Sequence, residues 1–137
     1  MTSCIILGDS IAVGTGWAMP QCTTRAQKGI SSINFNRKWL KTYSDRKVII
    51  SLGTNDKSLS SDDAEQTKIE LIKLRRNIIS NDVTWLIPAI KPLTRNAVYN
   101  VAYMFGDKTI DLLNISLSRD GIHPTIKGYH SLANMLR

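Results

Sequence analysis

The sequence contains few of the residue types from which metal sites are built, with only two cysteines and two histidines. Two cysteines without clustered histidines exclude the usual zinc ligand sets, so we expect no metal ion and no cofactor. For Cys4 and Cys22 we expect two buried thiols in a reducing compartment. A disulfide between them requires side-by-side strands and an oxidising milieu.

The sequence also lacks long hydrophobic runs. None approaches the ~20 apolar residues of a membrane helix, so we expect no transmembrane segment. The apolar stretch Cys4–Leu7 is too short for a signal peptide and no basic residues precede it. The chain as written therefore predicts a cytoplasmic protein. A mature form trimmed of its signal would instead be secreted or directed to the cell envelope.

Acidic residues are in the minority, with 11 Asp and Glu against 18 Lys and Arg, which gives a net charge of +7. A basic surface favours polyanions in general, and an anionic glycan is one such partner. The basic residues are dispersed, and no recognition motif for nucleic acid accompanies them. The charge therefore indicates a solvated surface and predicts no specific nucleic-acid partner.

The length of 137 residues fits one domain, and no repeat or linker divides the chain, so we expect a single domain over residues 1–137. Strands alternate with helices, which predicts a parallel sheet between helical layers. Gly14 and Gly16 are expected to stop a helical turn at 11–13. The predicted strands are 4–7, 22–26, 47–52, 83–87 and 108–115; the predicted helices are 31–43 (starting at either serine, 31 or 32), 62–80, 94–105 and 125–136.

Polar clusters interrupt the apolar pattern at three predicted strand ends: Gly8–Ser10, Gly53–Asp56 and Asp120–Pro124. Taken singly, each resembles an ordinary turn. In parallel α/β sheets, however, chemistry sits at the carboxyl ends of the strands. We therefore expect the three clusters to form one site.

A serine nucleophile needs a base that takes its proton, and the base needs a carboxylate that orients it. Ser10 supplies the hydroxyl and His123 the imidazole. Asp120 precedes His123 by three residues, which lets its carboxylate reach the imidazole Nδ1. The predicted catalytic residues are therefore Ser10, His123 and Asp120. Asp9 and Asp56, beside these positions, are predicted to order their loops.

The order of these clusters resembles the sequence blocks of the SGNH/GDSL hydrolases, whose four letters correspond to Ser10, Gly29, Asn55 and His123. The resemblance covers nearly the whole chain, and the lone glycine is its least specific block. It implies a flavodoxin-like, three-layer α/β/α fold with a central parallel sheet and metal-free ester hydrolysis. It also implies an oxyanion hole made by the N–H groups of Ser10 and Gly29 and the Asn55 amide. The serine is followed by Ile11 where lipase-like members have leucine.

The resemblance predicts a serine esterase that acts through an acyl-enzyme on small esters, with an acylated carbohydrate as substrate and O-acetylesterase as the leading activity. The chain is short for this family, so we expect an open, shallow cleft. Two alternatives remain open. A lysophospholipase or thioesterase would require an apolar groove beside Ser10. A non-catalytic glycan-binding module would retain the fold without reacting.

Overall fold

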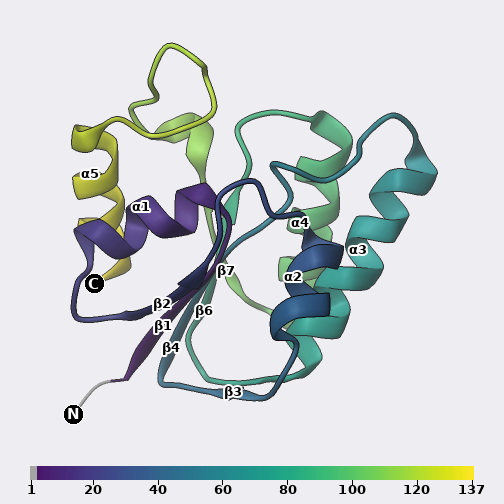
Figure 1. Ribbon diagram of the computed structural model, residues 1–137, viewed down its shortest axis with the longest axis horizontal. Helices are drawn as coiled ribbons and strands as arrows, with labels where there is room; N and C mark the ends of the chain where they lie inside the picture. The colour runs from purple at the N-terminus through teal and green to yellow at the C-terminus, as the bar shows by residue number, and fades with distance from the viewer. Residues whose placement is uncertain (1–2) are drawn as a thin grey trace.

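The computed structural model describes residues 3–137, which form a β-sheet covered by helices on both faces (Figure 1). The predicted α/β fold class is confirmed. The strands are β1 (Cys4–Gly8), β2 (Thr23–Ala26), β3 (Tyr43–Ser44), β4 (Lys47–Ser51), β5 (Ile78–Ile79), β6 (Val83–Ile87) and β7 (Lys108–Asp111). The helices are α1 (Ser10–Ala18), α2 (Ser32–Trp39), α3 (Ser61–Arg76), α4 (Pro92–Phe105) and α5 (Ile126–Leu136), with a 3₁₀ turn at Leu112–Asn114.

The main sheet has five strands in the order β2-β1-β4-β6-β7, and every neighbouring pair is parallel. Strands β3 and β5 form a separate two-stranded pair. The chain runs from β1 outward to β2 and then returns to place β4 on the other side of β1. This reversal creates a crevice beyond the carboxyl ends of β1 and β4, where ligands bind in open α/β sheets.

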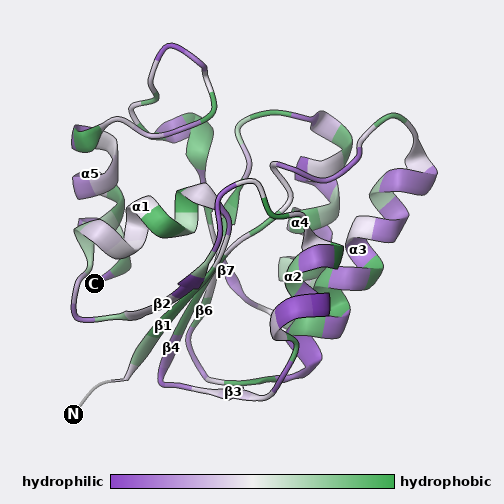
Figure 2. Ribbon diagram, viewed as in Figure 1, coloured by the Kyte–Doolittle hydropathy of each residue, from purple (hydrophilic) through white to green (hydrophobic). Residues whose placement is uncertain are grey.

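Three layers follow from the side-chain pattern of the central strands. Helices α1 and α5 cover one face of the sheet, and α2, α3 and α4 cover the other (Figure 1). Alternate residues of β1 point to opposite faces. Ile5 and Leu7 pack in the core beneath α2–α4, whereas Ile6 packs beneath α1 and α5. In Figure 2 the central strands and much of the inward-facing helix surface are hydrophobic, and hydrophilic residues lie mostly outside.

Helix α1 departs from the prediction, because it continues through both glycines to Ala18. Glycine costs a helix about 1 kcal/mol relative to alanine, but tertiary packing overrides that preference here. A Cβ atom at Gly14 would lie 2.2 Å from the ring of Tyr129, and one at Gly16 would lie 2.2 Å from the hydroxyl of Thr24. The glycines therefore allow α1 to approach α5 and β2 closely.

The predicted helices over 31–43 and 62–80 are both shorter in the structure. Helix α2 ends at Trp39, because Tyr43 pairs with Ile78 in the small β3–β5 sheet. Helix α3 ends at Arg76 for the same reason. Its N-cap is Ser60 rather than Asp62, and the Ser60 hydroxyl accepts from the N–H of Asp63.

The last predicted strand, 108–115, ends at Asp111. The Asp111 carboxylate accepts a hydrogen bond from the N–H of Leu113 and caps the 3₁₀ turn that follows. Helix α4 begins two residues before the predicted start, because Pro92 occupies its first turn, where a missing N–H costs nothing. The strand at 83–87 has the predicted bounds.

The cysteine prediction was wrong, because Cys4 and Cys22 form a disulfide in the structure. Strand β1 pairs with β2 in parallel register, and Ile5 lies opposite Thr23. The preceding residues, Cys4 and Cys22, are therefore also neighbours, with Cα atoms 4.7 Å apart. The bond joins the strand that leads to Ser10 to the edge of the sheet.

Candidate active site

The turn after β1 is shaped by close contact with β4. Gly8 has a φ of +144°, and a Cβ atom there would lie 1.9 Å from the carbonyl oxygen of Ser51. Only glycine fits this position. The N–H of Asp9 then donates to the same carbonyl oxygen. This geometry ends β1 and makes Ser10 the first residue of α1, at the carboxyl end of the sheet.

Asp9 is fully buried and orders this turn, as the sequence predicted. Its Oδ1 accepts from the Ile11 N–H and from the Ser51 hydroxyl, both at 3.0 Å. Burial raises the pKa of the Asp9 carboxyl to about 6, although the hydrogen bond from Ser51 opposes the shift. The carboxylate is therefore held in its place at the cost of an unfavourable buried charge.

This buried carboxyl predicts a pH-dependent stability effect for Asp9→Asn. In the folded state the pKa of Asp9 is about 6, above its ordinary value of 3.8, so its contribution to stability is complete below pH 4 and is lost as the pH rises through 6. Asparagine keeps an acceptor and does not ionise. We expect the free energy of unfolding of Asp9→Asn, relative to wild type, to increase by about 2–3 kcal/mol from pH 4 to pH 7.

Urea denaturation of both proteins at each pH measures this difference. Subtracting wild type from the variant cancels the titration of the other groups that the two proteins share. A difference that stays constant between pH 4 and pH 7 would show that Asp9 ionises normally in the folded protein.

The fold brings Ser10, His123 and Asp120 together in a hydrogen-bonded chain. Ser10 Oγ lies 2.9 Å from His123 Nε2, and His123 Nδ1 lies 2.6 Å from Asp120 Oδ2. The side chains of His123 and Asp120 are 40% and 43% exposed, so the end of this chain is open to solvent. This is the arrangement that a nucleophile, its base and an orienting carboxylate require.

Asp120 is held by more than His123. Its second oxygen, Oδ1, accepts from the backbone N–H groups of Ile122 and His123 and from the Ser118 hydroxyl. The hydrogen bonds from the backbone and imidazole of His123, with those from Ile122 and Ser118, hold the pKa of Asp120 well below its usual range. The carboxylate therefore stays ionised in mildly acidic solution. Ser118 was not among the predicted residues, and its only sequence signal was a hydroxyl two residues before Asp120.

Gly29 lies in a turn closed by a hydrogen bond from the Ile30 N–H to the Gln27 carbonyl oxygen. Its φ of +78° is in the left-handed region that favours glycine. A side chain here would meet no atom within 4 Å, so the backbone of Gly29 faces open space. Within residues 3–137, no acceptor receives a hydrogen bond from the N–H of Gly29 or of Ser10. Both donors are thus available to a ligand.

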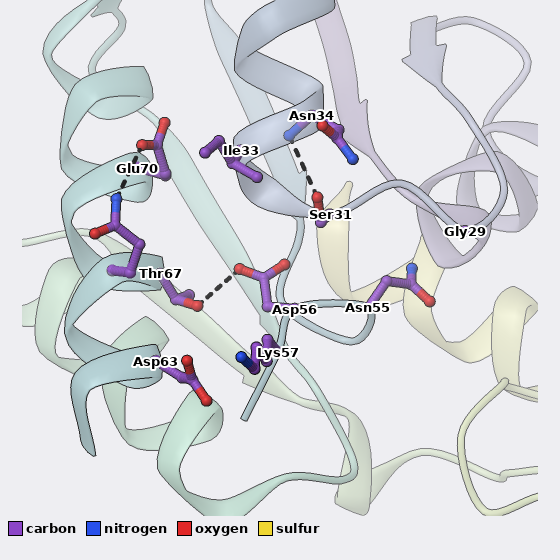
Figure 3. A pocket seen from close by; sticks show the side chains of 11 residues that line it. Gly29, Ser31, Ile33, Asn34, Asn55, Asp56, Lys57, Asp63, Thr67 and Glu70 are labelled. Atoms are coloured by element: carbon purple, nitrogen blue, oxygen red, sulfur yellow. Dashed lines mark hydrogen bonds between the residues drawn. The ribbon is translucent and has the colours of Figure 1, made fainter. Parts of the chain in front are cut away.

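Asn55 follows β4, and its side-chain amide donates to the carbonyl oxygen of Ile30 at 3.2 Å. This bond uses one of the two amide hydrogens and holds the Asn55 side chain beside Gly29 (Figure 3). Asp56 fixes the same loop, since its carboxylate accepts from the Ser32 N–H and the Thr67 hydroxyl, both at 2.8 Å. The loop-ordering prediction for Asp56 agrees with these bonds, which also join α2 to α3.

Four of the five predicted site residues line one open cleft of about 600 Å³, which we call the Ser10 cleft. Asp120 lies behind His123 and does not line it. The cleft residues are Ser10, Val13, Gly14, Lys28, Gly29, Asn55, His123 and Tyr129.

Four residues of the Ser10 cleft were not predicted as site residues from the sequence: Val13, Gly14, Lys28 and Tyr129. Burial raises the pKa of Tyr129 to about 12, and the negative charges of Asp9 and Asp120 add to the shift. Its hydroxyl therefore remains protonated at neutral pH and can donate a hydrogen bond. The only sequence signal was the spacing of Tyr129 six residues after His123, which is uninformative without the fold.

Trp17 and Met19, which follow the nucleophile in sequence, lie outside the cleft lining. Trp17 is exposed and its ring centroid lies 5.3 Å from that of His130, whereas Met19 is buried. Within residues 3–137, no group of three or more His, Cys, Asp or Glu side chains is placed to hold a metal ion. In the same range, no helix is both long and apolar enough to cross a membrane.

No protein-family model matches the chain, and no curated protein matches its sequence. Solved structures do match. A GDSL-like lipase from Bacteroides thetaiotaomicron is 17% identical and superposes with a TM-score of 0.67, over 97% of this chain and 84% of that one. A carbohydrate acetylesterase family member from Sinorhizobium meliloti is 12% identical, with a TM-score of 0.68 over 98% of this chain and 94% of the other.

A third similar structure is a carbohydrate esterase whose active site displays divergent catalytic and non-catalytic binding functions. It is 14% identical and has a TM-score of 0.77, over 98% of this chain and 66% of its own. These likenesses, with the order of the parallel strands, show that the chain has the SGNH hydrolase fold. The predicted three-layer architecture is therefore confirmed.

Proposed function

We propose that the chain is a serine esterase that hydrolyses small carboxylic esters of carbohydrates, with O-acetyl groups as its main substrates. The observation that carries this proposal is the hydrogen-bonded chain from Ser10 through His123 to Asp120. The fold adds support, since GDSL-like lipases and carbohydrate acetylesterases share it. The O-acetyl preference rests on the open cleft beside Ser10, which offers no enclosed tunnel for a long acyl chain.

In this proposal, His123 Nε2 takes the proton of Ser10 as Oγ attacks the ester carbonyl carbon. The carbonyl oxygen becomes an oxyanion, which the N–H groups of Ser10 and Gly29 and the Asn55 amide stabilise. His123 then protonates the leaving alcohol, and the acyl group remains on Ser10. Water attacks the acyl-enzyme with His123 again as base, which releases the acid and restores Ser10. Asp120 holds the imidazole with its Nδ1 proton toward the carboxylate throughout.

The role proposed for Asn55 predicts a loss of turnover in Asn55→Ala. A hydrogen bond to the oxyanion strengthens only in the transition state, so we expect kcat to fall about 10²–10³-fold while KM changes little. Steady-state kinetics on p-nitrophenyl acetate measure both constants. Thermal denaturation controls for the lost bond to Ile30. A rise in KM at constant kcat would mean that Asn55 binds the ground state instead.

The test of the proposed function is an activity screen over acetylated sugars and p-nitrophenyl esters of increasing acyl length. An O-acetylesterase should be most active on the acetyl esters and lose activity as the chain lengthens. Rising activity up to long chains would instead favour the lysophospholipase or thioesterase alternative. A protein that hydrolyses none of them and still binds glycan would be the non-catalytic module.

The Cys4–Cys22 disulfide is relevant to the compartment in which the protein functions. Disulfides persist mainly in oxidising compartments. We therefore propose a secreted or envelope location rather than the cytoplasmic one, and an anionic glycan of the envelope would suit the net charge of +7. Thiol titration of the denatured protein, purified from its native host without reductant, tests the bond. Two titratable thiols would favour the reducing compartment.

A further inference from the structure

A second pocket adjoins the Ser10 cleft and shares Gly29 and Asn55 with it. Its volume is about 410 Å³, and it lies between α2, α3 and the loop that follows β4 (Figure 3). We call it the α2–α3 pocket. Because two of the three predicted oxyanion donors form its boundary with the cleft, a substrate whose ester carbonyl is held by those donors has a direct route into this pocket.

The residue types of the lining favour a polar occupant over an alkyl chain. Apart from Gly29 and Ile33, every residue that lines the α2–α3 pocket has a polar side chain. An apolar group placed there would cover the exposed amides of Asn34 and Gln66 without giving them new partners, and each unsatisfied polar group costs about 1–3 kcal/mol. The pocket therefore fits a ligand that forms hydrogen bonds.

The lining also carries more acidic than basic side chains. Three carboxylates, Asp56, Asp63 and Glu70, line it against one ammonium group, that of Lys57. Glu70 is 4% exposed, and Oε1 is fixed by a 3.0 Å bond from the Asn36 amide. Its other oxygen, Oε2, has only the longer contacts of 3.4 and 3.5 Å to Lys73 and Gln66. Both Glu70 oxygens therefore have partners within the protein, Oε2 through an ion pair with Lys73, whereas the exposed amides of Asn34 and Gln66 remain accessible to a ligand.

We propose that the α2–α3 pocket is a subsite for an uncharged, hydroxyl-rich sugar unit next to the unit that carries the ester. This inference rests on the proposed function and specifies its substrate. Sugar hydroxyls donate to the carboxylates and amides of the lining, whereas the carboxylate of a uronic acid would meet like charges. Among the lining residues only Lys57 is basic, so most of the 18 Lys and Arg lie outside the pocket, and the pocket itself favours neutral glycans.

The rim of the pocket allows a test that leaves the fold intact. Asn34 and Gln66 are exposed, on α2 and α3. The quantity compared is kcat/KM for acetylated xylo-oligosaccharides divided by kcat/KM for p-nitrophenyl acetate. In Asn34→Leu and in Gln66→Leu we expect this ratio to fall about tenfold, because each variant loses one or two hydrogen bonds to the sugar. The lower kcat/KM for the oligosaccharide should result from a higher KM. Asn100→Leu, exposed on α4 and outside both pockets, is the matched control and should keep the wild-type ratio.

Wild-type enzyme should also prefer acetylated xylo-oligosaccharides to acetylated oligogalacturonides. An equal rate on the two glycans, or an unchanged ratio in both leucine variants, would overturn the subsite. Binding of unacetylated xylo-oligosaccharide to Ser10→Ala, measured by calorimetry, tests the sugar subsite without relying on esterase activity. It therefore distinguishes a failure of the subsite proposal from a failure of the proposed function. Binding that Gln66→Leu abolishes would support the subsite even in a protein without esterase activity, and the absence of binding to Ser10→Ala would count against it.

Discussion

Replacing Ser10 with alanine should lower kcat by about 10⁴–10⁶-fold, because the variant has no oxygen that can form the acyl-enzyme. The residue lies at the first position of α1, with its hydroxyl in the open cleft and 2.9 Å from His123 Nε2. The side chain makes no buried contact that the fold depends on, and alanine is a good helix former. Steady-state hydrolysis of p-nitrophenyl acetate measures the loss.

Circular dichroism and thermal denaturation should give the same spectrum and nearly the same Tm for Ser10→Ala and wild type. A matched control is Ser31→Ala, which removes a hydroxyl that caps α2 at the neighbouring loop. That change should cost about 1 kcal/mol of stability without the large loss of turnover. Wild-type turnover in a folded Ser10→Ala protein would exclude Ser10 as the nucleophile.

The second large effect is expected for Asp120→Asn, with a fall in kcat of about 10⁴-fold. Asparagine retains an acceptor for the Ser118 hydroxyl and for the backbone N–H groups of Ile122 and His123. It places an amide N–H against His123 Nδ1, however, where the carboxylate accepted a proton. The imidazole then carries its proton on Nε2, and it cannot accept the proton of Ser10.

Kinetics on the same ester, with the unfolding curve as control, test this effect. Ser118→Ala removes only one of the bonds to Asp120 Oδ1, so its loss should be far smaller. In wild type, activity should survive exhaustive chelation. Full activity in Asp120→Asn, or inactivation by EDTA that zinc reverses, would mean that His123 is not a base held by Asp120.

The buried central strands and the polar clusters that carry the candidate site were predictable, because their signals are local in sequence. The run Val83–Ile87 is apolar except for Thr84 and is buried on both faces of the sheet, as its composition predicts. The clusters at Gly8–Ser10 and Gly53–Asp56 follow the buried strands β1 and β4, whereas Asp120–Pro124 comes nine residues after β7, beyond the 3₁₀ turn. The fold brings Ser10, Asn55 and His123 to one cleft. For these residues, local pattern and tertiary structure agree.

The features that the sequence did not predict depend on contacts between distant segments. Local sequence predicts that Gly14 breaks the helix. In the structure, its lack of a side chain makes room for Tyr129 of α5. The Cys4–Cys22 bond depends on β2 lying beside β1, which the weak strand pattern of β2 did not establish. The α2–α3 pocket likewise arises only when α2, α3 and the loop after β4 meet. Local propensity carries no information on such contacts.

The most direct test of the central claim, that Ser10 is a nucleophile activated by His123, is labelling with a fluorophosphonate followed by peptide mass spectrometry. The account predicts one covalent adduct, on Ser10, that forms in wild type and is absent from Ser10→Ala. Labelling should slow strongly in His123→Ala, because the serine hydroxyl then has no base. A folded wild-type protein that remains unlabelled, or that carries the adduct on another residue, would contradict the account.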